Sequence, residues 1–325
     1  MVDPEPTPPG SAASRKLHFI CGGSDSRQDV EGPKREKKRR LDLEDTEQKD
    51  SRAEFEAKYQ EMYQQLGAGG CGAVFAGYRR EDGLPVAIKH IAEGYVFCKH
   101  VDYNGRELSI EVAVMLRLQE ETSGPLGTPA LGAPVFLLDW YNLDKELILV
   151  HERPVPCKDL LNDIKDKGGS LPEEEAKIIL KQLVDAAVDL QEKHIFHQDI
   201  KVENILIETG SDIPRVRLID FGLSRFVKKG ASYRRYYGTY QHVPPQWYSC
   251  NQNRPGPTTV WQMGVVLFET LHTGEDFMTK RFMEKSLTIS ETLSENCQDF
   301  LRLCLMEDPK QRPSLKQLRR HRWLK

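Results

Sequence analysis

Two short motifs constrain this 325-residue chain more than any other part of it. Residues 197–204 read His-Gln-Asp-Ile-Lys-Val-Glu-Asn, and residues 220–222 read Asp-Phe-Gly. Phosphoryl transfer needs a carboxylate to orient a hydroxyl nucleophile, a cation to neutralise the moving group, and oxygen ligands for Mg²⁺. Asp199, Lys201 and Asn204 of the first motif supply these groups together with Asp220 of the second. An isolated Asp-Phe-Gly would usually mark only a turn. The fold must therefore bring the two motifs together.

A glycine-rich run lies far upstream, where residues 67–74 read Gly-Ala-Gly-Gly-Cys-Gly-Ala-Val. Glycines let the backbone approach phosphate oxygens closely. Dinucleotide-binding folds use a similar run, but they place a ribose-binding acid about twenty residues later. Here residues 86–89 read Val-Ala-Ile-Lys and place a lysine on an apolar strand. Such a lysine is costly unless paired. We expect its partner to be Glu111, in a helix at 107–118, with Glu107 as the alternative.

The first 55 residues differ in composition from the rest of the chain. Residues 1–14 are rich in Pro, Gly, Ala and Ser, and residues 34–40 form a basic block that is followed by an acidic stretch. Such a segment buries too little apolar surface to offset its ordering entropy, so residues 1–55 are expected to be a disordered charged tail. The basic block is either a nuclear-import signal or a solvated stretch of charge.

Apolar patterns from residue 59 onward are those of a folded domain. Residues 135–141 and 146–152 are expected to be two strands joined by a turn. A capping box at 170–173 predicts the start of an amphipathic helix. Residues 258–271 are apolar nearly all round, as in a buried helix. The chain thus changes from strand-rich to helix-rich, with a break near Pro154.

Composition excludes several classes of protein. The net charge of −3 and the 39% of apolar residues give no overall bias towards nucleic acid. The longest apolar stretches are too short to span a membrane, and no signal peptide is visible. Seven cysteines, odd in number and without a Cys-x-x-Cys pair, are typical of reduced thiols in a cytoplasmic or nuclear protein.

The order of these motifs resembles that of the eukaryotic protein-kinase domain over residues 59–324. The resemblance implies an α+β bilobal fold, with ATP and Mg²⁺ bound between the lobes. A small, mainly-β N-lobe would span residues 59–152 and a larger, mainly-α C-lobe residues 157–324, joined by a hinge at 152–156.

The resemblance also assigns roles to the motif residues. Lys89 would be held by Glu111 and would contact the α- and β-phosphates of ATP. Asp199 would orient the substrate hydroxyl. The implied catalytic residues are Lys89, Glu111, Asp199, Lys201 and Asn204, and the implied Mg²⁺ ligands are Asn204 and Asp220. The implied nucleotide-binding residues are Leu66, Gly67, Ala68, Gly69, Gly70, Cys71, Gly72, Ala73, Val74, Ala87, Lys89, Glu152, Asp159, Leu206 and Asp220.

A narrower resemblance lies in the hinge, where residues 152–156 read Glu-Arg-Pro-Val-Pro as in the Pim family. Gly-Thr at 238–239, ahead of Pro-Pro-Gln-Trp at 244–247, fits the same family. Pro154 has no N–H to donate, so the Glu152 carbonyl would be the main polar contact for adenine. The family phosphorylates Ser/Thr in proteins, with basic residues upstream of the phosphorylated site.

Acidic side chains around the cleft carry that basic preference in the family. Asp159, Glu203 and Glu275 stand at matching positions, whereas Asn162 and Val202 stand where acids are expected. The preference is therefore expected to be weaker here.

Three residues depart from the usual kinase pattern. Gln198 replaces an arginine that normally pairs with a phosphate on the activation loop, so activity is expected not to depend on that phosphate. Gln246 replaces a glutamate that pairs with the arginine matching Arg312, and we expect it to accept a hydrogen bond instead. His151 stands at the gatekeeper position before the hinge, where it either makes the adenine pocket more polar or is simply a satisfied histidine, the interpretation we prefer.

Two alternatives to an active kinase remain open. A nucleotide-binding pseudokinase or scaffold would be expected to have lost a catalytic residue, and a small-molecule kinase to lack the Gly-Thr and Pro-Pro-Gln region. Neither loss is present, so the chain is expected to be an ATP-dependent protein kinase. It is expected to act on protein substrates as a monomer, without nucleic-acid or membrane partners.

Overall fold

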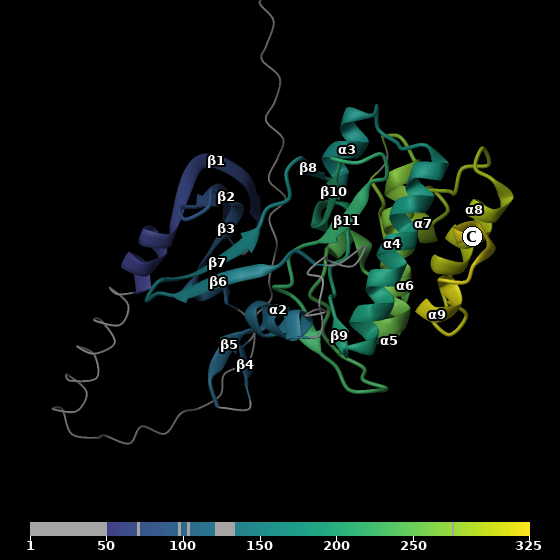
Figure 1. Ribbon diagram of the computed structural model, residues 1–325. Helices are drawn as coiled ribbons and strands as arrows, with labels where there is room; N and C mark the ends of the chain where they lie inside the picture. Colours follow the sequence, from purple (N-terminus) through teal and green to yellow (C-terminus); the bar gives the residue numbers. More distant parts are fainter. Residues whose placement is uncertain (1–50, 70–71, 97–98, 103–104, 121–133, 275) are drawn as a thin grey trace, which may run out of the picture.

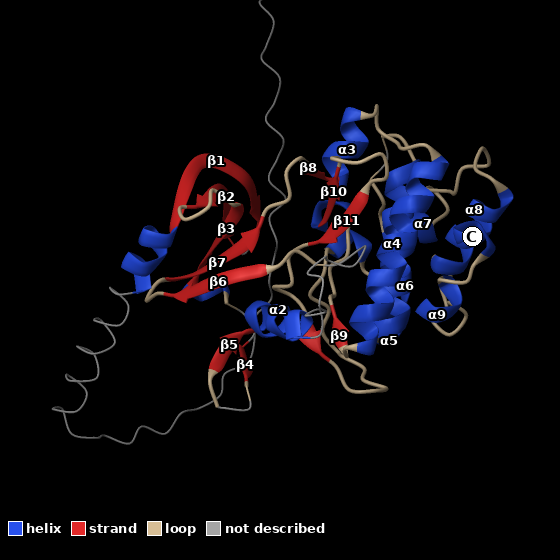
Figure 2. Ribbon diagram, viewed as in Figure 1, coloured by secondary structure: helices blue, strands red, loops and turns tan. Residues whose placement is uncertain are grey.

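The computed structural model describes residues 51–69, 72–96, 99–102, 105–120, 134–274 and 276–325. It shows two lobes, one built on a β-sheet and the other mostly helical, joined by the chain that leaves β7 (Figures 1 and 2). The bilobal α+β fold expected from the sequence is confirmed. The basic block at 34–40 and most of the expected tail lie outside the described residues.

The N-lobe contains a five-stranded antiparallel sheet with the strand order β1-β2-β3-β7-β6. Its central strands are rich in β-branched residues, and Ile88, Ile148 and Val150 are fully buried there. The strand expected at 135–141 begins two residues later and ends one residue later, at Asn142. The strands are β1 (Tyr59–Gly69), β2 (Gly72–Arg79), β3 (Pro85–Ala92), β6 (Leu137–Asn142) and β7 (Glu146–Glu152).

Helix α2 (Ile110–Glu120) begins later than the helix expected at 107–118. The first residues of that segment form β5 (Glu107–Ser109), which pairs with β4 (Lys99–Val101) in a hairpin. The Ser109 hydroxyl accepts the amide of a residue in the first helical turn, so it fixes the helix start. The expected helix was therefore correct in kind but wrong at its N-terminus.

The end of the expected tail differs from the sequence-based expectation. Residues 51–58 are helical and lead directly into β1. Phe55 is buried, with its ring centroid 5.5 Å from that of Tyr141 and 6.1 Å from that of Tyr59. One aromatic residue in a polar stretch is enough to dock this turn on the sheet, a signal that composition alone does not give.

The C-lobe is organised around α4 and α6, which pack together and bury apolar residues such as Leu183 and Phe268. Cys157, Cys250, Cys297 and Cys304 are unpaired. The helices are α3 (Leu160–Asp166), α4 (Glu173–Glu192), α5 (Pro245–Cys250), α6 (Pro255–Leu271), α7 (Thr279–Met283), α8 (Glu295–Cys304) and α9 (Leu315–Leu318), with short 3-10 helices η1 (Glu93–Tyr95), η2 (Val202–Asn204), η3 (Tyr240–His242) and η4 (Arg322–Leu324).

Helix α4 is found where it was expected, but the predicted capping box is wrong. Pro172 occupies the N-cap and makes no side-chain cap bond. The Glu173 carboxylate instead accepts the amide and hydroxyl of Ser294 and the indole N–H of Trp323. A long-range contact with the last turns of the chain therefore outcompetes the local cap.

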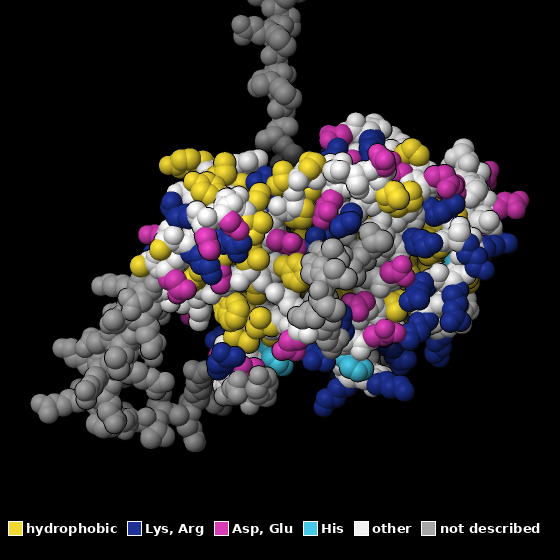
Figure 3. Space-filling model, viewed as in Figure 1, with side chains coloured by type: hydrophobic (Ala, Val, Ile, Leu, Met, Phe, Trp, Pro, Cys, Tyr) yellow, Lys and Arg dark blue, Asp and Glu magenta, His cyan; other side chains and the backbone are white. Residues whose placement is uncertain are grey.

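Short strands link the helical lobe to the hinge. One three-stranded sheet has the order β11-β10-β8, and β9 pairs with β12. None of the described helices is long and apolar enough to cross a membrane. Side chains of both charges are spread over the face in Figure 3, with Lys and Arg gathered at the C-lobe end. These strands are β8 (Cys157–Asp159), β9 (Ile195–Phe196), β10 (Ile205–Glu208), β11 (Arg215–Leu218) and β12 (Arg225–Phe226).

Candidate active site

Lys89 lies at the centre of the site, on β3 opposite Leu149 of β7. Its Nζ is 2.8 Å from both carboxylate oxygens of Glu111 on α2 and 2.8 Å from Asp220 Oδ1. The pairing with Glu111 is therefore the one that the sequence favoured. Glu107, the alternative, is exposed on β5 and pairs with Lys99. The strand lysine, the helix glutamate and the acid of Asp-Phe-Gly thus meet across the two lobes.

Charge compensation governs the protonation of this cluster. Burial alone would lower the pKa of Lys89, but the opposing charges of Asp220 and Glu111 outweigh it and raise that pKa. The Lys89 charge in turn lowers the pKa of Asp220 to about 2. Asp220 is therefore ionised at neutral pH and carries the negative charge that a Mg²⁺ ligand needs.

The first motif places its acid against the segment that follows Asp-Phe-Gly. Asp199 Oδ1 accepts hydrogen bonds from the amide and the hydroxyl of Thr239, each at 2.8 Å. Lys201 Nζ lies 3.2 Å from Asp199 Oδ2 and donates to the Thr239 hydroxyl. The side-chain Nδ2 of Asn204 donates to the Asp199 carbonyl at 2.9 Å. The side-chain oxygen of Asn204 is therefore the atom that can ligate a cation.

The glycine-rich run forms the ends of β1 and β2, and Gly67 pairs with Val74. A Cβ on Gly67 or Gly69 would meet no atom within 4 Å, so these positions lie open. Gly72 is different, because a Cβ there would lie 1.8 Å from the His90 carbonyl oxygen on β3. Strand packing therefore requires glycine at position 72, whatever that residue does for phosphate. Gly70 and Cys71 lie outside the described residues.

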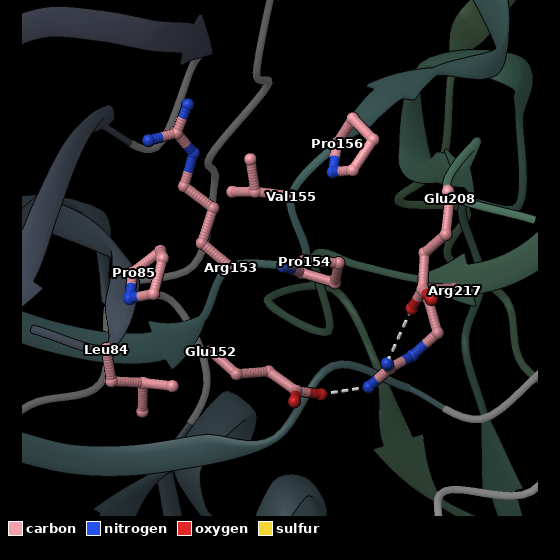
Figure 4. Close-up of a pocket in the computed structure, with 10 residues that line it drawn as sticks. Leu84, Pro85, Glu152, Arg153, Pro154, Val155, Pro156, Glu208 and Arg217 are labelled. Atoms are coloured by element: carbon pink, nitrogen blue, oxygen red, sulfur yellow. Dashed lines mark hydrogen bonds and ion pairs between the residues drawn. The ribbon is translucent and has the colours of Figure 1, made fainter.

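The hinge carries an ion-pair network that the sequence did not predict. Arg217 on β11 is almost fully buried and pairs with the Glu152 carboxylate and, at 2.8 Å, with Glu208 of β10 (Figure 4). Glu152 also accepts the Phe136 amide at 2.9 Å. A cavity of about 320 Å³ is lined by these residues and by the hinge prolines, including Pro154. No local motif links the three charged residues, because they come from three separate strands.

His151 lies opposite Ala87 in the pairing of β3 and β7, one residue before the hinge. Directly paired residues of antiparallel strands share a face, so His151 lies on the face that carries Ala87 and Lys89. Its side chain is buried, and its Nδ1 has no hydrogen-bond partner among the described residues. Burial, with a smaller contribution from the Lys89 charge, lowers its pKa to about 3. Among the described residues, the expectation of a satisfied histidine is therefore not met at Nδ1.

The two glutamines that replace kinase-typical residues are both buried. Gln198 has a left-handed backbone (φ 75°) and donates its side-chain amide to the Leu223 carbonyl. Gln246 Oε1 accepts a hydrogen bond of 2.9 Å from Arg312, as expected from the sequence. Arg312 also stacks on Trp261, 4.8 Å from the ring centroid, which helps to hold its charge.

Three more of the expected site residues, Asp159, Glu203 and Leu206, lie on β8, η2 and β10. Asp159 pairs with Leu206 in the strand register and caps α3 by accepting an amide hydrogen bond. Glu203 has a carboxylate oxygen that is buried without a partner in the described part of the chain. Glu275 lies outside the described residues. All the described catalytic residues that the sequence singled out therefore converge on the region between the lobes.

Comparison with known proteins agrees with this geometry. Residues 60–324 match the protein kinase domain family. The chain is 32% identical over 289 residues to the serine/threonine-protein kinase pim-2 of Danio rerio, covering 88% of this chain and 91% of that protein. It is 28% identical over 279 residues to the serine/threonine-protein kinase prk-2 of Caenorhabditis elegans, covering 83% and 59%. Sperm motility kinase 3A of Mus musculus is 28% identical over 270 residues, covering 81% and 49%.

Proposed function

Since the chain belongs to the protein kinase family, as a Pim-like Ser/Thr protein kinase, we propose that it phosphorylates proteins in a basic sequence context without needing a phosphate on its activation loop. The family generally uses ATP and Mg²⁺. The observation that carries the proposal is the assembled cluster in which Lys89 bridges Glu111 and Asp220 at 2.8 Å. A pseudokinase would have no need to keep all three charges in this arrangement.

The donor set fits a nucleotide bound with Mg²⁺. Asp220 is ionised, and Asn204 has an amide oxygen to offer, so both suit a hard cation. Bound MgATP would supply the phosphoryl group. In this proposal Lys89 binds the phosphates, Lys201 neutralises charge on the moving group, and Asp199 orients the substrate hydroxyl.

Independence from a loop phosphate is supported by contacts already made in the described part of the loop. Thr239 holds Asp199 through its amide and hydroxyl, and Gln198 binds the Leu223 carbonyl where other kinases have an arginine. A glutamine side chain carries no charge with which to attract a phosphate. The loop is thus anchored at both ends by neutral groups.

A basic substrate preference is supported by Glu203. One of its carboxylate oxygens has no hydrogen-bond partner among the described residues, and the residue as a whole is only half-buried. A substrate arginine or lysine can pair with this carboxylate from its exposed side. Replacing the upstream basic residues of a peptide by alanine should raise KM, and Glu203→Gln should reduce the difference between the two peptides.

The proposal also covers the cellular location of the protein, its oligomeric state and the role of its N-terminal basic block. We place the kinase in the cytoplasm or the nucleus as a monomer, without nucleic-acid or membrane partners, and residues 34–40 as the candidate import signal. Imaging of the full chain beside a variant in which this block is neutralised tests the localisation.

The decisive assay compares the chain with Asp199→Asn, using MgATP and a basic Ser/Thr peptide. Phosphate transfer by the parent and not by the variant is expected. Equal transfer by both would reject the assignment. If neither transfers phosphate while ATP still raises the melting temperature, the pseudokinase alternative takes its place. Treatment with phosphatase, checked by intact mass, should leave the activity of the parent unchanged.

A further inference from the structure

Arg225 makes an unusual pair of contacts in the segment that follows Asp-Phe-Gly. It lies on β12, where it pairs with Phe196 of β9. Its guanidinium carbon lies 4.4 Å from the ring centroid of Tyr233 and 5.5 Å from that of Tyr237. Both distances are within the range of an attractive cation–π interaction. One arginine therefore touches two aromatic rings that are separated along the activation segment.

The surroundings of Arg225 make these ring contacts important. Its Nε is buried without a hydrogen-bond partner, and no carboxylate forms an ion pair with it among the described residues. A guanidinium that is partly removed from water without a counter-charge is costly. The negative faces of the two tyrosine rings offset part of that cost, and cation–π attraction strengthens as the cation is desolvated.

Tyr233 lies where the segment is attached to the rest of the C-lobe, and Tyr237 lies close in sequence to a second attachment at Thr239. The amide and carbonyl of Tyr233 exchange hydrogen bonds of 2.9 and 2.8 Å with Asn253, which is fully buried. Tyr237 is two residues before Thr239, whose amide and hydroxyl hold the catalytic Asp199. The position of the Tyr237 ring therefore bears directly on the position of the catalytic carboxylate.

We propose that Arg225 is a positioning residue that holds the activation segment in its substrate-accepting arrangement by stacking on Tyr233 and Tyr237. In kinases switched by phosphorylation, an arginine orders this segment by pairing with a phosphate. Here the ring faces take the place of the phosphate, and Gln198 supplies no competing charge. The inference rests on the proposed independence from a loop phosphate and names the contact that makes it possible.

The chemistry predicts which part of each tyrosine matters. A cation–π contact uses the face of the ring, so Tyr233→Phe and Tyr237→Phe keep the interaction while Tyr233→Leu and Tyr237→Leu remove it. Arg225→Lys keeps the charge but loses the planar group that stacks. Arg225→Leu removes both. An exposed tyrosine on α5, Tyr248, gives the matched control Tyr248→Leu.

The test measures kcat and KM for peptide and ATP in each variant, with the intact mass confirming the absence of phosphate. We expect each leucine variant to raise the peptide KM roughly 2- to 30-fold with little change in the KM for ATP, because loss of the stack loosens the peptide-binding segment. The phenylalanine variants and Tyr248→Leu should stay close to the parent, and Arg225→Lys should lie in between.

A double-mutant cycle makes the result specific. Arg225→Leu combined with Tyr233→Leu should be no worse than the more damaging single variant, because the second change removes a contact already lost. Limited trypsin digestion at Arg234 and Arg235 should be faster in the leucine variants, a readout that does not depend on activity.

Four outcomes would overturn the inference. Equal losses in the phenylalanine and leucine variants would assign the effect to the hydroxyl groups, and additive effects in the cycle would show that the arginine and the ring act separately. If a leucine variant does not fold, as judged by its melting transition, Arg225→Lys is tested in its place. Trypsin cleavage of Arg225→Lys that is as slow as cleavage of the parent would count against the stack. If dephosphorylation inactivates the parent, the proposed function fails. If the parent stays active and the leucine variants match it, only the present inference fails.

Discussion

His151→Leu tests whether a buried, unpaired imidazole destabilises this kinase. The side chain is 8% exposed, and its Nδ1 has no partner among the described residues. Leaving such an atom unsatisfied costs about 1–3 kcal/mol, whereas an apolar side chain of similar size fits the same place without that cost. We therefore expect the variant to be more stable than the parent at neutral pH, by an amount within that range.

The stability difference between His151→Leu and the parent should also depend on pH, by an amount that follows from the pKa of His151. Burial lowers the pKa of His151 to about 3, from 6.5 in the unfolded chain. Between these values the unfolded state binds a proton that the folded state does not, so the parent loses stability as the pH falls below 6.5. At about 1.4 kcal/mol per pH unit, the loss near pH 5 is about 2 kcal/mol. His151→Leu removes this loss, so its advantage should grow by that amount.

Urea unfolding near pH 7.5 and near pH 5 measures both quantities. The matched control is His194→Asn, because His194 is exposed and has a left-handed backbone (φ 59°) that asparagine tolerates. This control is measured at the same two pH values. An advantage of His151→Leu that stays constant between the two pH values, or that shrinks at low pH, would refute the reasoning. A destabilised variant at neutral pH would show that Nδ1 does have a partner.

Three further predictions concern the hinge and the C-lobe. Gln246→Glu should stabilise the protein by about 1–2 kcal/mol in chemical unfolding, because it gives the buried Arg312 an opposite charge. Unchanged stability would mean that the neutral hydrogen bond of Gln246 already stabilises Arg312 as well as a charge does. Pro154→Ala restores a hinge N–H that can donate one more hydrogen bond to the nucleotide, so the nucleotide affinity measured by calorimetry should rise roughly five-fold. Equal affinity would exclude a hinge contact at that position. Arg217→Met should destabilise by about 3 kcal/mol, because Glu152 and Glu208 lose their shared cation, and a neutral effect would show that the two carboxylates are solvated independently.

What the sequence predicted well depended on motifs with fixed local spacing. The partner of Lys89 could be named because a helix with a suitable glutamate follows the Val-Ala-Ile-Lys strand, whereas Gln246 could be matched to Arg312 only through the resemblance to the kinase family. The bilobal fold followed from the change of pattern near Pro154. Each of these predictions used residues whose chemistry is specific even before the chain folds.

What the sequence did not predict depended on long-range competition. Glu173 looked like a local cap but binds Ser294 and Trp323, which lie at the other end of the domain. The missing partner of His151 Nδ1 is a property of its surroundings, and no pattern in the chain encodes it. The arginine stack on Tyr233 likewise arises only when the loop has folded back on itself.

Arg217 also bears on how the two lobes move against each other. Its guanidinium holds Glu152, where the N-lobe sheet ends, and Glu208, on a C-lobe strand. The planar fork of an arginine resists reorientation more than a lysine would, and burial protects both ion pairs from salt. The end of β7 is thus tied by side chains to β10 and β11 of the other lobe. If the angle between the lobes changes, we expect the backbone to bend from Arg153 onward, because Glu152 is held by Arg217.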